Sequence, residues 1–275
     1  MTEFRRVLFR SLLYSRGHFM LSRNFRLQKV GDFNWLQRNY DFSHIAYSID
    51  ELVVLNVDRD GAYQKEFCDV LKMLAKGCFA PIAAGGGVRT IEDARALLRS
   101  GADKIVLNTP LYESPELVRA LAAEFGQQCI VGSVDVKRSE GGGYAVFSGC
   151  GAIEREGTLQ EWIDRISAEA VGEIYLNSID RDGTGQGYDF GILDFLSREI
   201  PIPVIFAGGV GNASHLAAGL ADSRVDAVAT ANLFNFVGDG LKQARRALID
   251  GGVNLPLWDV ALMERRLGPL RETAQ

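Results

Sequence analysis

The chain has 275 residues, of which 47% are hydrophobic, so it can form one large domain with a substantial core. A formal net charge of −5 without a basic run excludes bulk binding to nucleic acid or to a membrane surface. There is no signal-peptide core and no run of about 18 apolar residues. The four cysteines show neither CxxC pairs nor zinc spacing. We therefore expect a cytoplasmic protein with reduced thiols and with no metal or cofactor.

Short apolar runs alternate with helix-like segments along the chain. Eight runs are predicted strands: 6–13, 51–57, 80–84, 103–107, 129–135, 172–178, 203–207 and 225–230. The clearest helices are predicted between them: 90–100, 114–125, 157–170, 212–221 and 239–250. In the first of these helices, Thr90 and Asp93 have the spacing of a capping box.

This alternation predicts a parallel sheet covered by helices. Eight units in two equal halves favour a single (β/α)8 TIM barrel over an open doubly wound sheet, and the length fits a barrel of about 250 residues. The segment 139–157 is long for a connection between a strand and a helix. It is predicted to form a small hairpin at the mouth of the barrel.

The chain repeats itself at an offset of 122 to 123 residues. The segment ELVVLNVDRDG at 51–61 matches EIYLNSIDRDG at 173–183, and both end in an acidic turn followed by glycine. AAGGGV at 83–88 likewise matches FAGGVG at 206–211. Recurrence at one spacing predicts a half-barrel duplication, with halves at roughly 1–125 and 126–250 and a C-terminal extension at 251–275.

Glycines and small polar residues end several predicted strands, where the active site of a barrel is built. Glycine lets backbone amides approach an anion, and the N-terminus of a following helix carries partial positive charge. Two phosphate sites are therefore predicted, formed by Gly87, Asn108 and Thr109 in the first half and by Asp182, Gly183, Gly209, Ala231 and Asn232 in the second. The glycines could instead serve only tight turns, but their recurrence in both halves favours a ligand phosphorylated at both ends.

Asp135 is the candidate for proton transfer. It ends a predicted strand after an apolar run, where desolvation raises the pKa of a carboxyl group and suits it to general acid or base work. The alternative is a salt bridge to Lys137 or Arg138, although these two neighbours alternate along the extended chain. The histidines have no evident serine or cysteine partner and are expected to be ordinary surface or helix residues: His18, His44 and His215.

Five segments carry motifs of a known family: DELVVLNVD at 50–58, AGGGVRTIEDARALLRSGADKIVLNT at 84–109, SVDVKR at 133–138, GEIYLNSIDRDGTGQGYD at 172–189 and AGGVGNASH at 207–215. With them the chain resembles the histidine-biosynthesis barrels, most closely the cyclase subunit of imidazole glycerol phosphate synthase. The resemblance covers nearly the full chain. It implies a barrel that receives ammonia from a glutaminase docked on its amino-terminal face, and a ligand with two phosphates.

Members of that family use two aspartates as acid and base, and Asp135 matches the second. The first falls on Leu12 by the family alignment, and the internal repeat places it on Leu12 or Leu13. Leucine neither donates nor accepts a proton, and loss of an acid–base partner costs about 10² to 10⁴ in rate. The family's ligand-contacting lysine falls near Met20, and its strand-two aspartate corresponds to Asn56.

The resemblance also implies a ring of charged residues that guards an ammonia entrance at the other end of the barrel, and all four are present: Arg6, Glu51, Lys104 and Glu173. The alternative is that charges at strand starts pair only for stability. Retention of all four types favours a gate, and Asp103 matches a contact to the glutaminase. Arg10 conflicts with this assignment, because an inward face shared with Leu12 would place it inside the barrel.

Several functions remain open. The retained gate and the lost acid resemble family members that pass ammonia to a sugar amidotransferase in surface-polysaccharide biosynthesis, and this ammonia relay is the favoured interpretation. A genuine cyclase would need Asp135 to act alone or with another group, and restored activity in Leu12→Asp would support it. A non-catalytic subunit that binds a phosphoribosyl ligand is a third possibility. The isomerase of the same pathway fits less well, because it also needs the first aspartate and takes no ammonia.

Overall fold

The computed structural model describes residues 8–39, 48–58, 64–231 and 240–256. Parallel strands form a closed barrel, in the spatial order β1 (Leu8–Ser15), β4 (Glu51–Asn56), β5 (Ile82–Gly85), β6 (Lys104–Leu107), β7 (Ile130–Arg138), β10 (Glu173–Ser178), β11 (Val204–Ala207) and β12 (Ala227–Thr230). The ring closes because β12 pairs with β1 and β10 pairs with β7. This confirms the predicted (β/α)8 barrel, and all eight predicted strands are present with small shifts of their ends.

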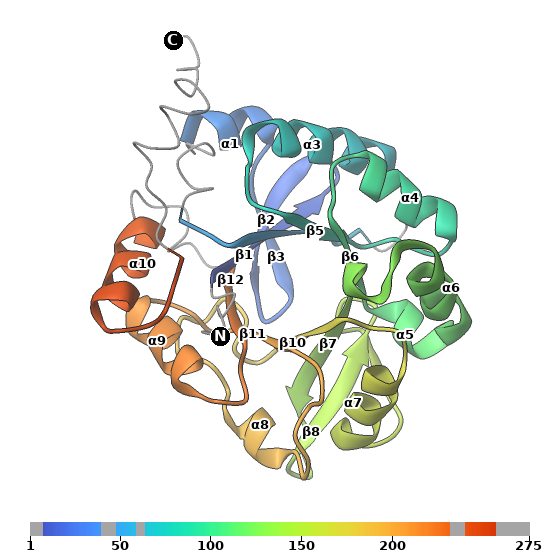
Figure 1. Ribbon diagram of the computed structural model, residues 1–275, viewed down its shortest axis with the longest axis vertical. Coiled ribbons are helices and arrows are strands. Elements are labelled where there is room, and N and C mark those ends of the chain that lie inside the picture. Colours follow the sequence, from blue (N-terminus) through green and yellow to red (C-terminus); the bar gives the residue numbers. More distant parts are fainter. Residues whose placement is uncertain (1–7, 40–47, 59–63, 232–239, 257–275) are drawn as a thin grey trace.

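Helices surround the barrel (Figure 1). They are α1 (Phe33–Asn39), α3 (Gln64–Gly77), α4 (Ile91–Arg99), α5 (Thr109–Glu113), α6 (Pro115–Phe125), α7 (Leu159–Ala168), α8 (Gly191–Phe195), α9 (Ala213–Ala221) and α10 (Gly240–Asp250), with a 3-10 turn at Gln127–Cys129. The five predicted helices correspond to α4, α6, α7, α9 and α10. Within the described ranges, none of the helices has the length and apolar character needed to cross a bilayer.

Two helices begin at capping boxes. In a capping box, the side chain of the N-cap residue accepts a hydrogen bond from the backbone amide of the third helical residue, and the side chain of that residue accepts one from the N-cap amide. In α4, Thr90 Oγ1 accepts from the Asp93 amide at 3.2 Å, and Asp93 Oδ2 accepts from the Thr90 amide at 2.8 Å. In α7, Thr158 and Glu161 make the same exchange at 3.2 and 2.8 Å. The first box was predicted from spacing alone and is confirmed.

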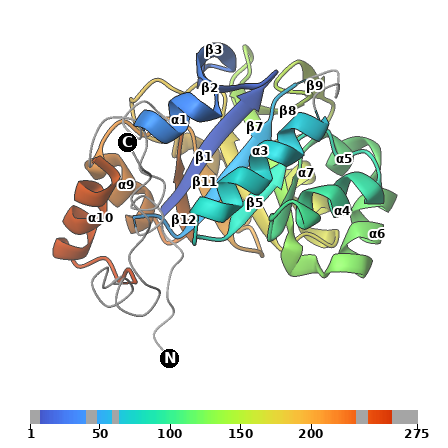
Figure 2. The same ribbon diagram turned by 90° about the horizontal axis from the view of Figure 1, so that it is seen from above.

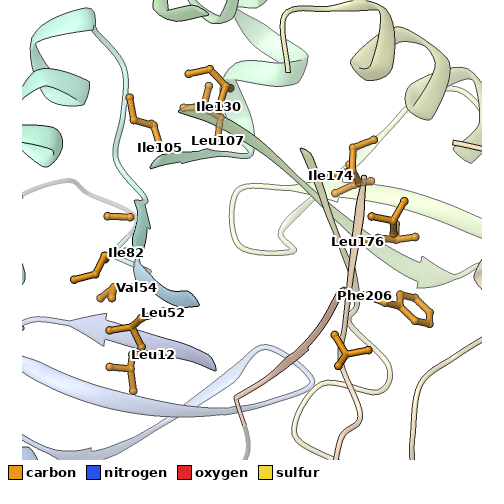
Figure 3. Close-up of a cluster of buried hydrophobic side chains, with 14 of the residues drawn as sticks. Leu12, Leu52, Val54, Ile82, Ile105, Leu107, Ile130, Ile174, Leu176 and Phe206 are labelled. Atoms are coloured by element: carbon orange, nitrogen blue, oxygen red, sulfur yellow. The ribbon is translucent and has the colours of Figure 1, made fainter. Parts of the chain in front are cut away.

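Alternate residues of each barrel strand face the interior and the helix layer. The inward residues form one apolar cluster, with Phe9, Val53, Val106 and Tyr175 among its members. The outward residues point away from the enclosed centre, as Figure 3 shows for Leu12, Leu52, Val54, Ile82, Ile105, Leu107, Ile130, Ile174, Leu176 and Phe206. Each buried side chain of this size contributes about 1.5–3 kcal/mol. Both faces are buried, so a slip of one residue in any strand would exchange the two layers.

The register of β1 decides which residue takes the place of the missing aspartate. Ser11 and Leu13 face the interior and line its cavity, whereas Leu12 is 1% exposed and belongs to the outer cluster. Of the two leucines considered for the missing aspartate, Leu13 is therefore the one that faces the cavity. In the pairing register Leu13 lies beside Leu55, as Asp135 lies beside Asn177. Both pairs differ by the same 122 residues (135 − 13 and 177 − 55), so Leu13 is the counterpart of Asp135.

The same register removes the conflict over Arg10. Arg10 is fully buried, but it alternates with the inward Phe9 and Ser11 and pairs in register with the outward Leu52. It therefore faces the helix layer and not the barrel interior.

Two hairpins lie at the carboxyl ends of the barrel strands (Figure 2). The first, β2 (His18–Arg23) and β3 (Arg26–Gly31), follows β1 directly. The second, β8 (Tyr144–Ser148) and β9 (Ile153–Arg155), follows β7 and confirms the hairpin predicted within 139–157. The first hairpin was not predicted.

Candidate functional site

A cavity of about 750 Å3 opens at the carboxyl ends of the barrel strands. The predicted phosphate residues that the structure describes all line it: Gly87, Asn108, Thr109, Asp182, Gly183, Gly209 and Ala231. Asp135 lines the same cavity, and Asn232 lies outside the described residues. Residues from both halves of the chain therefore surround one space, as a ligand phosphorylated at both ends would require.

Paired glycines end β5 and β11 at this cavity. Gly86 and Gly87 have φ of 93° and 73°, and Gly208 and Gly209 have φ of 92° and 106°. A Cβ atom on Gly86 would lie 1.9 Å from the carbonyl oxygen of Asn56, so both conformation and space require glycine there. Such bare backbone beside a cavity suits amides that bind an anion.

Asp135 projects from β7 into the cavity and is only 7% exposed. Asn177 Nδ2 donates to its Oδ1 at 3.2 Å, and Asn108 Nδ2 donates to its Oδ2 at 3.3 Å. Burial raises the pKa of Asp135 to about 7, with a further contribution from the negative charge of Asp182, while the Asn177 hydrogen bond opposes the rise. A carboxyl group with this pKa can both donate and accept a proton near neutral pH.

The alternative of a salt bridge at Asp135 is not what the structure shows. Arg138 pairs instead with Asp189 at 2.6 Å, and the Tyr144 hydroxyl donates to the same Asp189 oxygen at 3.0 Å. Lys137 is exposed at the end of β7. Among the described residues, no cation forms an ion pair with Asp135.

The position that corresponds to Asp135 in the first half is apolar. Leu13 lines the cavity there, and in the antiparallel register of β1 and β2 its partner is Met20. By the resemblance, the family's first aspartate falls on Leu12 and its ligand-contacting lysine falls near Met20, and the internal repeat also allows Leu13 for the aspartate. Where a carboxylate and an ammonium group are expected from the resemblance, the chain therefore has two apolar side chains that are cross-strand partners. A single leucine could be an isolated change, but the paired replacement removes both charges together.

The first hairpin is fastened to the Asp182 turn. Asp182 Oδ2 accepts hydrogen bonds from the Ser22 hydroxyl and, at 3.1 Å, from the Phe25 amide, and the Asp182 carbonyl accepts from the Asn24 amide at 2.9 Å. Asp182 is 8% exposed, and burial raises the pKa of its carboxyl group while the two hydrogen bonds oppose the rise. Sequence reasoning assigned Asp182 to phosphate binding but gave no sign of these contacts. They cross about 160 residues, as Ser22 and Asp182 show (182 − 22).

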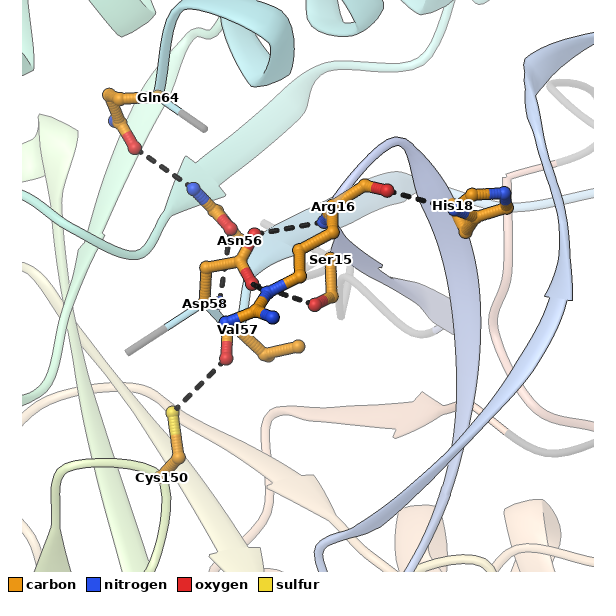
Figure 4. A network of polar contacts seen from close by, with 8 residues as sticks. All are labelled: Ser15, Arg16, His18, Asn56, Val57, Asp58, Gln64 and Cys150. Carbon is orange, nitrogen blue, oxygen red and sulfur yellow. Dashed lines mark hydrogen bonds and ion pairs between the residues drawn. The ribbon is translucent and has the colours of Figure 1, made fainter. Parts of the chain in front are cut away.

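A second network at the mouth was also missed (Figure 4). Asp58 is 9% exposed and accepts from the Ser15 hydroxyl at 2.8 Å, the Arg16 amide at 2.9 Å and Arg16 Nε at 3.3 Å. Asn56, at the position of the family's strand-two aspartate, accepts from the Asp58 amide at 3.1 Å and donates to Gln64 at 3.0 Å. Cys150, in the loop of the second hairpin, donates a hydrogen bond from Sγ to the Val57 carbonyl at 3.8 Å (Figure 4).

The described histidines have ordinary roles. His18 Nδ1 lies 2.8 Å from the Arg16 carbonyl, and His215 Nδ1 accepts from the Gly211 amide at 3.1 Å. His44 lies outside the described residues. In the described part of the chain, no three histidine, cysteine, aspartate or glutamate residues are grouped to hold a metal ion.

Three of the four predicted gate residues meet at the amino ends of the strands. Lys104 Nζ lies 2.8 Å from Glu51 Oε2 and 2.8 Å from Glu173 Oε2, and all three residues are less than 10% exposed. The Lys104 ammonium also lies 6.0 Å from the centre of the Phe9 ring. Arg6 lies outside the described residues. The charges therefore form a buried triad at the floor of the barrel, which is compatible with both a gate and a structural ion cluster.

Asp103, the predicted glutaminase contact, is exposed at the same end. Its Oδ2 accepts from the Ile82 amide at 2.8 Å, and its amide donates to the Ile82 carbonyl at 2.7 Å. Asp226 makes the same two contacts with Val204 in the second half, at 2.9 and 3.0 Å. The shared geometry gives Asp103 a local structural role, and contact with a partner stays a prediction.

Two polar side chains from opposite halves of the chain meet in the barrel interior. The hydroxyl groups of Tyr175 on β10 and Ser11 on β1 lie 2.8 Å apart, and both residues line the cavity. Tyr175 is 5% exposed, and burial raises the pKa of its phenol. On β10 it lies between Glu173 of the triad and Asn177, which binds Asp135, with all three on the inward face. One strand thus spans from the floor to the site.

A closed (β/α)8 barrel with a carboxylate and two glycine-lined ends in one cavity defines a TIM-barrel protein with a candidate small-molecule site. The chain belongs to the histidine biosynthesis protein family, whose model matches residues 39–238. It is 44% identical over 255 residues to a protein of Parasynechococcus marenigrum (strain WH8102) named "Putative imidazole glycerol phosphate synthase subunit hisF2". That match covers 92% of this chain and 94% of the relative.

Proposed function

We propose that this cytoplasmic barrel receives ammonia from a glutaminase bound to its amino-terminal face and relays it to the amidation of a sugar in surface-polysaccharide biosynthesis. The name of the similar relative supports the coarser part of the proposal, a protein like the cyclase subunit of imidazole glycerol phosphate synthase. In this proposal Glu51, Lys104 and Glu173, with Arg6, form the ammonia gate, and Asp103 contacts the glutaminase.

The observation that carries the proposal is Leu13. It faces the cavity at the position that corresponds to Asp135, and its cross-strand neighbour Met20 is apolar as well. Cyclisation by two carboxylates therefore lacks its first acid, whereas the charged residues at the floor are retained. A barrel that retains the charged residues of the proposed ammonia entrance but lacks one of the two catalytic carboxylates is better suited to deliver ammonia than to consume it.

A genuine cyclase is the second candidate, and Asp182 favours it. Its carboxyl group lines the same cavity as Asp135, and burial raises its pKa. It could supply the second acid from the end of β10. The hydrogen bonds from Ser22 and Phe25 count against this role, because they hold one carboxylate oxygen in place.

The test is to mix the purified chain with the formimino-ribulosyl bisphosphate substrate of the cyclase and saturating ammonium, and to follow product formation directly. Free ammonium removes the need for a glutaminase, so the assay isolates the chemistry of the barrel. Ligand binding without turnover is expected. Turnover that Asp135→Asn abolishes would replace the relay by the cyclase. Binding without turnover, combined with failure of glutamine-derived ammonia to reach any acceptor, would leave a non-catalytic phosphoribosyl-binding subunit.

A further inference from the structure

A second hollow lies at the same end of the barrel as the cavity. It is an open cleft between the β2–β3 hairpin and the end of β7, lined by Arg23, Asn24, Arg26, Leu27, Gln28, Lys137, Ile179 and Asp180. Leu27 lines both this cleft and the central cavity, so the two spaces adjoin. None of the phosphate residues predicted from the sequence lines the cleft.

The cleft collects positive charge on a chain whose net charge is −5. Arg23, Arg26 and Lys137 are exposed there, and no carboxylate within the described ranges forms an ion pair with them. Other arginines at this end do have such partners, for example Arg138 with Asp189 and Arg16 with Asp58.

The acid in the cleft is already bound to backbone. Asp180 Oδ2 accepts from the Arg138 amide at 2.8 Å, which holds this carboxylate at the cleft floor. Three cations and one carboxylate give the cleft a formal charge of +2. Such a hollow attracts anions, and its position at the mouth concentrates them beside the cavity.

The cleft is also preorganised. Two arginines flank the hairpin tip, Asn24 and Phe25, whose φ angles of 50° and 61° lie in the left-handed region. Hydrogen bonds hold this conformation: Asn24 Nδ2 donates to the Asp180 carbonyl at 2.7 Å and to the Ile179 carbonyl at 3.2 Å. These hydrogen bonds connect the tip to the segment after β10, so the backbone that carries Arg23 and Arg26 is held in place. A ligand that they bind does not have to order the hairpin first.

We propose that this cleft is a third anion site, which binds a phosphate or diphosphate group of a small molecule. Arg23 and Arg26 present planar sets of N–H donors that match phosphate oxygens, and Lys137 adds a compact charge from the opposite wall. The cleft adjoins the cavity at Leu27, so it takes either a separate phosphate compound or an anionic arm of a ligand seated in the cavity. The proposal depends on these residues alone and not on ammonia transfer.

The test is a titration of the purified full chain with inorganic pyrophosphate, followed by amide chemical shifts. Lys137 and Gln28 report on the cleft, whereas Gly87 and Gly209 report on the two glycine-lined ends in the same sample. Saturable shifts are expected at the cleft amides. Arg26→Glu combined with Lys137→Glu should weaken binding there at least tenfold and leave the curve at Gly209 unchanged.

A matched control is Lys76→Glu combined with Arg99→Glu, two exposed cations on helices α3 and α4 that line neither hollow. This control makes the same change in net charge and should leave cleft binding within about twofold, because exposed charges that are farther apart than about 10 Å are screened at 0.1 M salt. Equal weakening in both double variants would show a net-charge effect and overturn the site. Shifts at the glycines with none at the cleft would also overturn it while leaving the phosphate sites of the proposed function intact. Shifts at the cleft alone would support it and count against those phosphate sites.

Discussion

The two ends of the barrel hold buried charges in opposite ways. At the amino end, Lys104 lies between Glu51 and Glu173, so the burial of each charge is offset by an opposite charge within 3 Å. At the carboxyl end, Asp135 and Asp182 are buried without an ion pair to any described cation, and the pKa of each is raised. Buried ion pairs such as those of Lys104 are typical of a structural element. Carboxyl groups with a raised pKa beside a cavity are typical of a ligand-binding or catalytic site.

Of the substitutions considered, Lys104→Met should cause the largest loss in the free energy of unfolding. It leaves Glu51 and Glu173 buried without their shared cation, and removal of one partner from a buried ion cluster lowers the free energy of unfolding by about 3–5 kcal/mol. Urea denaturation at pH 7 measures the loss. Adding Glu51→Gln and Glu173→Gln to the same chain should recover most of it, because no buried charge then remains in the triad. A loss below about 1 kcal/mol in Lys104→Met would show that the triad is solvated and not buried.

Asp135→Asn should change the pH dependence of stability. The folded pKa of about 7 exceeds the ordinary value of 3.8, so the folded state keeps a proton that the unfolded chain loses. The contribution of Asp135 to stability is therefore most favourable below about pH 4 and is lost as pH rises from about 4 to about 7. Asparagine removes this slope and should raise the free energy of unfolding at pH 8 by on the order of 2–4 kcal/mol. Parallel slopes in the two proteins between pH 4 and 7 would contradict the raised pKa.

Leu13→Asp should place a second carboxyl group in the cavity that contains Asp135. A second carboxyl group in the cavity is expected to raise cyclase turnover with free ammonium by about 10² or more, at a stability cost of about 1–3 kcal/mol. Leu12→Asp is the matched control, because Leu12 faces the helix layer and is 1% exposed. It should destabilise the chain more and restore nothing. Activity in Leu12→Asp and none in Leu13→Asp would reverse the register.

Thr158→Ala should have the smallest effect, because Thr158 caps helix α7 and belongs neither to the triad nor to the lining of the cavity. It removes the acceptor for the Glu161 amide at the start of α7, which costs about 1 kcal/mol. Thermal unfolding should report this loss with unchanged ligand binding. A change in binding would connect α7 to the cavity, although none of its residues lines the cavity.

The barrel could be predicted from the sequence because burial on both faces leaves strands as short apolar runs between amphipathic helices. The strand Glu173–Ser178 and the strand of similar sequence Glu51–Asn56 show this most clearly. The same property prevented a correct register in β1. In LFRSLLYS both layers contain apolar residues, so no alternation indicates which leucine faces inward. Pairing with neighbouring strands settles it, and pairing cannot be read from one strand.

The candidate site was predicted where residue type alone is informative. The glycine pairs after strands and the aspartate after an apolar run all line one cavity. The contacts that hold the mouth could not be predicted, because Ser22 with Asp182 and Ser11 with Tyr175 join residues 160 and 164 apart. Neither serine has a local pattern that identifies its partner. Only closure of the barrel brings them together.

Strand β10 connects the ion cluster at the floor of the barrel with the cavity at its other end. Glu173, Tyr175 and Asn177 occupy alternate positions on its inner face, and an extended strand rises only about 3.3 Å per residue with little freedom to stretch. The same strand therefore fixes the spacing between Glu173 of the triad and the Asn177 side chain that donates to Asp135. The position of Asp135 in the cavity and the position of the ion cluster at the floor thus depend on one continuous stretch of backbone.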